Sequence, residues 1–221
     1  MLDLHISGIG MISFVGYDAR TSCASIRAGI TRPGEYSSYT QLDFASQDEE
    51  PIIVHQIKGV TEGYHFLGLW SKLAKSCMQD LLDNNQLPEN SDRMFWQKTG
   101  IVAAIPNMDD DRFLGQKGIS VEYLKQDYVE KLLHDLDLPI LEKNIALVSY
   151  GSAGTLAAIN VTDEMINLGN VDRCIILSVD SYINQASLDW LQSFNRLKNV
   201  GQYDWIDTGR SRLLRDGGVG K

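Results

Sequence analysis

The sequence predicts an α/β fold in which a mostly parallel sheet is covered by helices on both faces. Short apolar strands alternate along the chain with helical segments, which is the pattern of sheets whose strands are joined by crossover helices. One strand also passes directly into a helix through a Gly-Ser-Ala-Gly turn at residues 151–154. In such folds, ligands bind outside the carboxyl ends of the strands.

The N-terminal residues 5–16 are expected to form a short apolar strand that is broken by glycines, and Asp18 is expected to cap the helix that follows. Gly8 and Gly10 are spaced as in a dinucleotide-binding turn. Ser13, however, occupies the position of the third glycine, and the next strand is too distant to supply a ribose-binding acid. We therefore expect no nucleotide site here.

The next segments alternate between loops and apolar elements. Residues 31–50 are rich in Ser, Thr, Tyr and acidic residues and are expected to form a surface loop before a short strand at 52–57. Apolar residues at three-and-four spacing predict a core-facing helix over 64–83. A strand is expected at 100–105, and a helix from Ser120 to the proline at 139.

Neither a metal site nor a disulfide framework is expected. The run Asp109–Asp111 lacks the spacing of a calcium loop and is interpreted as a solvated loop. The chain has three cysteines, an odd number without a Cys-x-x-Cys pair, and we expect them to be reduced and mostly buried. His134 lies off the apolar stripe of its helix and is expected to face solvent. No cofactor is predicted.

The segment 143–163 is the strongest candidate for a functional turn. It predicts a buried strand at Ile145–Tyr150, the Gly-Ser-Ala-Gly turn, and a helix. Backbone N–H groups at such a helix N-terminus favour an anion or a nucleophile. A further strand is expected at 174–179, and Asp180 and Ser181 follow it at the edge where α/β sheets bind ligands.

Composition excludes several classes of function. The formal net charge of −9 argues against binding to nucleic acids or anionic membranes, since both need a basic surface. The longest aliphatic runs are too short to span a bilayer, and the N-terminus lacks the pattern of a signal peptide. We therefore expect a cytoplasmic globular protein.

Several motifs occur in a specific order along the chain: ISGIGMISFVG at 6–16, IRAGI at 26–30, the elbow at 143–163, NLGNVDRCIILSVDS at 167–181 and RLLRDGGVG at 212–220. In this order the chain resembles the N-terminal half of the β-ketoacyl synthases, which have the thiolase fold. The resemblance implies that residues 1–221 form a single domain of that kind. It leaves open whether the last strand of that half is truncated.

The resemblance also implies that the nucleophile is missing. In that family the elbow carries a cysteine in a pattern such as A-C-A-S-G-T, and the matching position here is Gly151. The family's two catalytic histidines and its lysine belong to the C-terminal half, and no histidine of this chain matches them. Ser152 is the remaining candidate nucleophile, but without an assignable base its favoured interpretation is a helix N-cap.

Two functions follow from the resemblance. The first is a catalytically silent protein that acts as a partner or accessory subunit, forming a homodimer or a heterodimer through the Ile145–Tyr150 strand, which in that fold lies at the sheet edge. The alternative is an acyl-transfer or condensing enzyme of fatty-acid or polyketide synthesis, of which this chain is the N-terminal fragment. An acyl carrier protein is a further partner that the resemblance allows.

Overall fold

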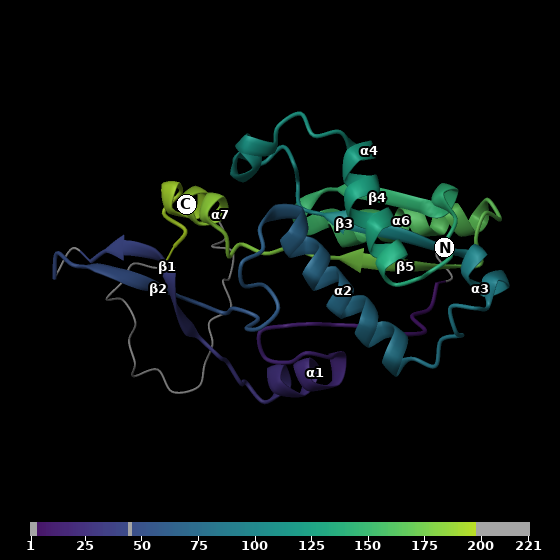
Figure 1. The fold of residues 1–221 in the computed structure, drawn as a ribbon, viewed down its shortest axis with the longest axis horizontal. Helices are drawn as coiled ribbons and strands as arrows, with labels where there is room; N and C mark the ends of the chain where they lie inside the picture. The colour runs from purple at the N-terminus through teal and green to yellow at the C-terminus, as the bar shows by residue number, and fades with distance from the viewer. Residues whose placement is uncertain (1–3, 44–45, 198–221) are drawn as a thin grey trace, which may run out of the picture.

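The computed structural model describes residues 4–43 and 46–197 and is built around a three-stranded parallel sheet in the order β4-β3-β5 (Figure 1). The central strand is β3 (Thr99–Ile105), and β4 (Ile145–Ser149) and β5 (Arg173–Ser178) flank it. Every residue of β3 is buried. An apolar strand with small residues tolerates such burial on both faces, so the predicted α/β fold with a parallel sheet is confirmed.

Helices cover both faces of this sheet. Alternate residues of β3 face opposite ways: Ile101 and Ala103 belong to the main core, whereas Val102 and Ala104 pack on the side of α6 (Gly154–Asn167). The main core contains α2 (Phe66–Asn84) and the helical run formed by α4 (Val121–Leu124), η2 (Lys125–Glu130) and α5 (Lys131–Asp135). The helices predicted over 64–83 and after Ser120 are therefore confirmed.

Side-chain caps fix where several helices begin. Asp18 accepts a hydrogen bond from Thr21 N at the start of α1 (Ala19–Arg27), as predicted. Ser120 caps α4 by accepting from the backbone N–H of Tyr123. The remaining short helices are α3 (Arg93–Gln97), η1 (Asp111–Gln116), η3 (Glu142–Asn144) and η4 (Gly151–Ala153).

The strand expected over residues 5–16 is absent, and only an isolated bridge between Ser13 and Gly16 is found there. The segment is bound to α2 instead, since Met11 N donates to Asp80 Oδ2 at 2.8 Å and Ile9 N donates to Asn85 Oδ1 at 3.1 Å. A Cβ added at Gly10 would lie 2.2 Å from the carbonyl oxygen of Cys77. Close packing on a helix backbone therefore explains this glycine without a nucleotide.

The loop expected over 31–50 contains β1 (Gly34–Leu42), which pairs antiparallel with β2 (Glu49–Val54). The strand expected at 52–57 thus belongs to a separate two-stranded sheet and is not part of the parallel sheet (Figure 1). Helix α7 (Gln185–Ser193) packs against this hairpin, where Leu188 meets Tyr39 and Ile52 in a small core. Exposed side chains largely alternate with buried or half-buried ones along β1. Most of its residues are polar, so its composition resembles that of a loop and does not predict this strand.

The three cysteines are free thiols, but their burial differs from the expectation. Cys23 is exposed on α1, whereas Cys77 and Cys174 are half-buried. Burial is the main cause of the raised pKa of the Cys77 and Cys174 thiols.

Two further expectations concern membrane-spanning segments and the C-terminal motif. Within the described ranges, none of the helices combines the length and the apolarity needed to cross a membrane. The RLLRDGGVG motif at 212–220 lies outside the described residues.

Candidate functional site

The carboxyl ends of the three parallel strands meet at one edge of the sheet and bring together the turns that follow them. Ile105 of β3 is in register with Ser149 of β4, and Ala104 of β3 is in register with Ser178 of β5. The segments that begin at Pro106, Tyr150 and Val179 therefore leave the sheet side by side. This edge is the one that the sequence predicts to hold the functional turn.

The elbow after β4 is a tight turn that requires glycine. Gly151 has a φ of +53°, the left-handed region that residues with a side chain rarely adopt. The turn continues through η4, and a Cβ added at Gly154 would lie 3.3 Å from Ala104 Cβ, so the start of α6 packs closely on β3. The strand, turn and helix predicted over this segment are confirmed, but the strand is mostly half-buried rather than buried, because it lies at the edge of the described sheet, and Tyr150 lies beyond its end and is 65% exposed. The space beside Gly151 is open, because an added Cβ would meet only Asn107, at 3.6 Å.

Ser152 acts neither as a helix N-cap nor as an activated nucleophile among the described residues. The N-cap of α6 is Ala153, and no side chain caps this helix, so the interpretation of Ser152 as an N-cap is wrong. Ser152 lies within the 3-10 turn η4, one residue before the position from which a side chain would cap α6. Its side chain is exposed, and among the described residues no group forms a hydrogen bond with its hydroxyl. No base among the described residues is therefore positioned to activate Ser152.

Polar groups next to the elbow are used within the loop after β3. Ser149 Oγ donates to the carbonyl of Pro106 at 2.9 Å and accepts from Met108 N at 3.0 Å. Asn107 Nδ2 donates to Asp110 Oδ1 at 3.1 Å, and its Oδ1 accepts from Asp109 N at 3.2 Å. These bonds connect the loop after β3 to the end of β4 and occupy the polar side chains of Ser149 and Asn107 next to Gly151.

A second feature of this edge is the ion pair between Arg112 and Asp180. Arg112 Nη2 lies 2.8 Å from Asp180 Oδ2, and the side chain of the arginine is 2% exposed while that of the aspartate is 36% exposed. The guanidinium carbon lies 4.6 Å from the ring centroid of Phe113 and 4.3 Å from that of Tyr182. The other oxygen of Asp180 accepts from Ser181 N at 2.7 Å. The pair thereby ties η1 to the end of β5.

Asp180 and Ser181 also line a cavity of about 350 Å³, together with His55 and Tyr182. The His55 ring lies 4.4 Å from that of Phe14, and burial lowers the pKa of this imidazole. The sequence predicts a ligand edge at Asp180 and Ser181, and the structure places both at a cavity. The sequence contains no local pattern that marks Arg112 or His55 as site residues, because their neighbours come from distant segments.

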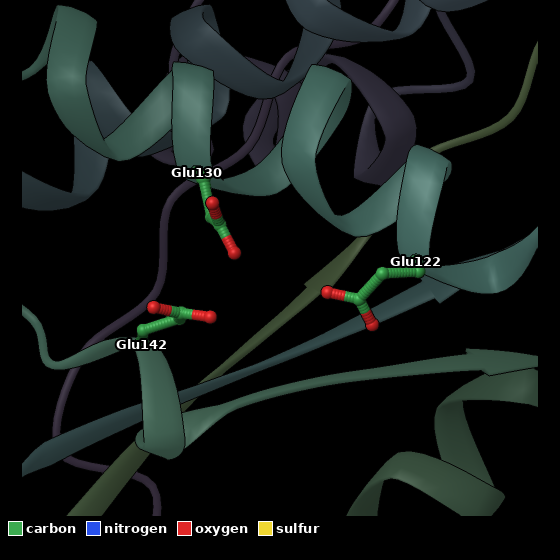
Figure 2. Close-up of side chains that lie close together, drawn as sticks. All are labelled: Glu122, Glu130 and Glu142. Carbon is green, nitrogen blue, oxygen red and sulfur yellow. The ribbon is translucent and has the colours of Figure 1, made fainter.

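Three glutamates from neighbouring helical segments point toward one another: Glu122 of α4, Glu130 of η2 and Glu142 of η3 (Figure 2). One carboxylate oxygen from each lies within 4.8 Å of the others. Glu122 and Glu142 are exposed, and Lys125 Nζ lies 3.9 Å from Glu130 Oε1 and offsets part of the charge. We interpret Glu122 and Glu142 as solvated surface charge, whereas Glu130 is half-buried and its Oε1 accepts no hydrogen bond from the described residues.

The histidines of the described residues do not assemble with the elbow. His134 of α5 is 90% exposed at its side chain, as predicted, and lies 3.7 Å from Asp135. His55 and His65 line two different cavities, neither of which includes Gly151 or Ser152.

The chain was compared with known proteins at the level of sequence. No model of a known protein family matches it, and no curated protein matches it with significant similarity.

Proposed function

We propose that this chain is a catalytically silent relative of the β-ketoacyl synthases, of thiolase type, and that it acts as a partner or accessory subunit by pairing through β4. The single observation that carries the proposal is the combination of an apolar edge strand with a glycine at the following turn. Gly151 offers no nucleophile at the position where the resemblance implies a cysteine, and an apolar strand that lacks a partner on one side is a surface for association.

Strand β4 has the properties of a pairing edge. Among the described residues it pairs only with β3, so its outer backbone groups lack a strand partner. It contains neither proline nor lysine, the residues that commonly protect such edges. Tyr150 and Leu156, which follow it, are 65% and 68% exposed. Antiparallel pairing with a second copy across a two-fold axis would satisfy the backbone groups and cover these side chains.

The alternative, an acyl-transferring enzyme, needs a nucleophile that the elbow does not supply. Ser152 would require a base within hydrogen-bond distance and groups that stabilise an oxyanion. Because its hydroxyl makes no hydrogen bond to any described residue, the silent role is favoured.

The oligomeric state of the purified chain tests the proposal. We expect light scattering to report a homodimer, and we expect the double substitution Tyr150→Lys and Leu156→Lys to give a monomer that still melts cooperatively. Leu168→Lys, at the far end of α6 and 75% exposed, is the matched control and should leave the dimer intact. A wild-type chain that stays monomeric at high micromolar concentration would contradict pairing through β4.

Catalytic silence needs its own measurement. Incubation with malonyl- and acyl-thioesters, followed by mass spectrometry of the intact chain, should show no acylated product. Stable acylation at Ser152 with turnover would overturn the silent role and favour the enzyme.

A further inference from the structure

A groove of about 520 Å³ lies between the first turns of α2 and the α4–η2–α5 run. Its lining includes no residue of β4 or of the elbow, so it is separate from the proposed pairing edge. The side chains along it include three lysines: Lys72 and Lys75 from α2, and Lys131 from α5. In a chain with a formal net charge of −9, a concentration of cations around one cavity requires an explanation.

The lysines face the groove because of helical spacing. On α2 the lining residues follow three-and-four spacing: Gly68, Ser71, Lys72 and Lys75. They occupy the face opposite the buried stripe of this helix. On the facing run the lining residues recur every four positions: Tyr123, Asp127, Lys131 and Asp135. Two regular stripes of polar side chains thus oppose each other across the cavity.

None of these lysines forms an ion pair with a described carboxylate within 4.0 Å. The Lys72 ammonium lies 4.6 Å from the ring centroid of Tyr64. The two aspartates of the groove interact with other groups: Asp127 accepts a hydrogen bond from Tyr123, which raises the pKa of that phenol, and Asp135 lies 3.7 Å from His134. The three ammonium groups therefore remain available to a ligand.

The rest of the lining is suited to contact with an aromatic ring. Most of its less exposed members are apolar, namely Phe66, Leu67, Ile119 and Leu132, and the polar Ser71 and Gln116 are half-buried beside them. Tyr64 and Tyr123 also line the groove and are 41% and 47% exposed, so aromatic surface is accessible on both sides of it. The volume lies within the range of about 300–1,000 Å³ that is usual for sites of small organic ligands.

We propose that this groove binds a small aromatic phosphate monoester. A phosphate monoester carries a charge of about −1.5 to −2 near neutral pH and three terminal oxygens, so it can accept a charge-assisted hydrogen bond from each lysine. The ring lies against the tyrosines and the apolar residues. The two aspartates of the lining offset part of the charge of the three lysines, and a bound phosphate would meet the positive charge that is left.

Calorimetry on the whole chain with phenyl phosphate is the test, and phenol and inorganic phosphate serve as half-ligands. We expect phenyl phosphate to bind more tightly than either half-ligand. Lys72→Gln and Lys131→Gln should each weaken it by about tenfold, the effect of losing one charge-assisted hydrogen bond. Asp135→Asn removes a like charge and should strengthen binding by about threefold.

Lys143→Gln is the matched control, because this exposed lysine lies outside the groove, and it should leave the affinity unchanged. Adenosine monophosphate in place of phenyl phosphate identifies the ring: tighter binding assigns a nucleotide and weaker binding a simple aryl ester, and both agree with the proposal. Phenol binding as tightly as phenyl phosphate, binding that the groove lysines do not affect, or no binding at millimolar concentration would overturn it. A melting curve for each variant shows that the fold is retained.

Discussion

Replacement of Asp80 by alanine should detach the N-terminal segment from the main core. Asp80 is on α2 and only 6% exposed, and its Oδ2 accepts hydrogen bonds from Met11 N and Ala19 N, both at 2.8 Å. Its Oδ1 accepts from Asn84 Nδ2, also at 2.8 Å. One carboxylate thus holds the segment before α1, the first residue of α1 and the end of α2 together.

The cost can be worked out from these bonds. A hydrogen bond to a charged group contributes about 1.5–3 kcal/mol, and the donors at Met11 and Ala19 are half-buried, so the free energy of unfolding should fall by about 3 kcal/mol in Asp80→Ala. Asp80→Asn keeps one oxygen for both N–H groups but loses the charge and the acceptor for Asn84 Nδ2, at a cost of about 2 kcal/mol. Asp83→Ala is the matched control on the same helix, since Asp83 is exposed and bonded only to Gln79. It gains the same helix propensity and should change stability by less than about 0.5 kcal/mol.

Urea denaturation followed by tryptophan fluorescence measures the free energies, and amide hydrogen exchange at Met11 and Ala19 locates the effect. The reasoning is refuted if Asp80→Ala is no more destabilising than Asp83→Ala. It is also refuted if stability falls while these two amides keep their protection, because the loss would then arise elsewhere.

Three further predictions each concern one side chain: Arg112, Tyr39 and Cys23. Arg112→Met leaves the charge of Asp180 unpaired, and because that carboxylate is 36% exposed the free energy of unfolding should fall by only about 2 kcal/mol in urea denaturation. Burial, reinforced by Asp189, raises the pKa of Tyr39 from 10.0 to about 12. The folded state binds this proton more tightly than the unfolded state, so its stabilising contribution is complete below pH 10 and is lost as pH rises toward about 12, a loss that Tyr39→Phe should abolish in melting curves. Cys23 should react with a thiol reagent before the other two cysteines, and Cys23→Ser should remove the fast phase.

A specific result would contradict each of these three predictions. An unchanged stability in Arg112→Met would mean that water already satisfies Asp180. Alkaline unfolding that is identical in Tyr39→Phe and the wild type would mean that other groups govern it. A fast phase that survives in Cys23→Ser would place a reactive thiol in the core.

The elements with strong periodicity could be predicted from the sequence, and those held by single long-range contacts could not. Strand β3 buries a continuous apolar run, helix α2 buries an apolar stripe, and the apolar runs of β4 and β5 are half-buried beside β3, so local pattern and tertiary environment agree. The N-terminal segment has a similar apolar composition, yet Asp80 and Asn85 satisfy its backbone in place of a neighbouring strand. No local pattern reveals that pairing, because the residues are about seventy positions apart.

The same contrast applies to the candidate site. The elbow could be located because glycines between a strand and a helix are a local signal, and the φ of +53° at Gly151 gives the physical reason for one of them. The pairing of Arg112 with Asp180 joins a 3-10 turn to the end of a strand 68 positions away. Composition around either residue is ordinary, so only the fold brings them together.

The two outer strands of the parallel sheet are not equivalent as surfaces for association. Strand β5 begins with Arg173, whose guanidinium stacks 4.2 Å from the Phe95 ring centroid and donates to the Phe95 carbonyl at 3.1 Å. Charged residues at a strand edge oppose pairing with another strand, and α3 is held against this end of β5. Strand β4 carries no charge and leads into exposed apolar side chains. If the chain associates through its sheet, this asymmetry favours β4, and a spin label at Tyr150 should show a short intermolecular distance that a label at Arg173 does not.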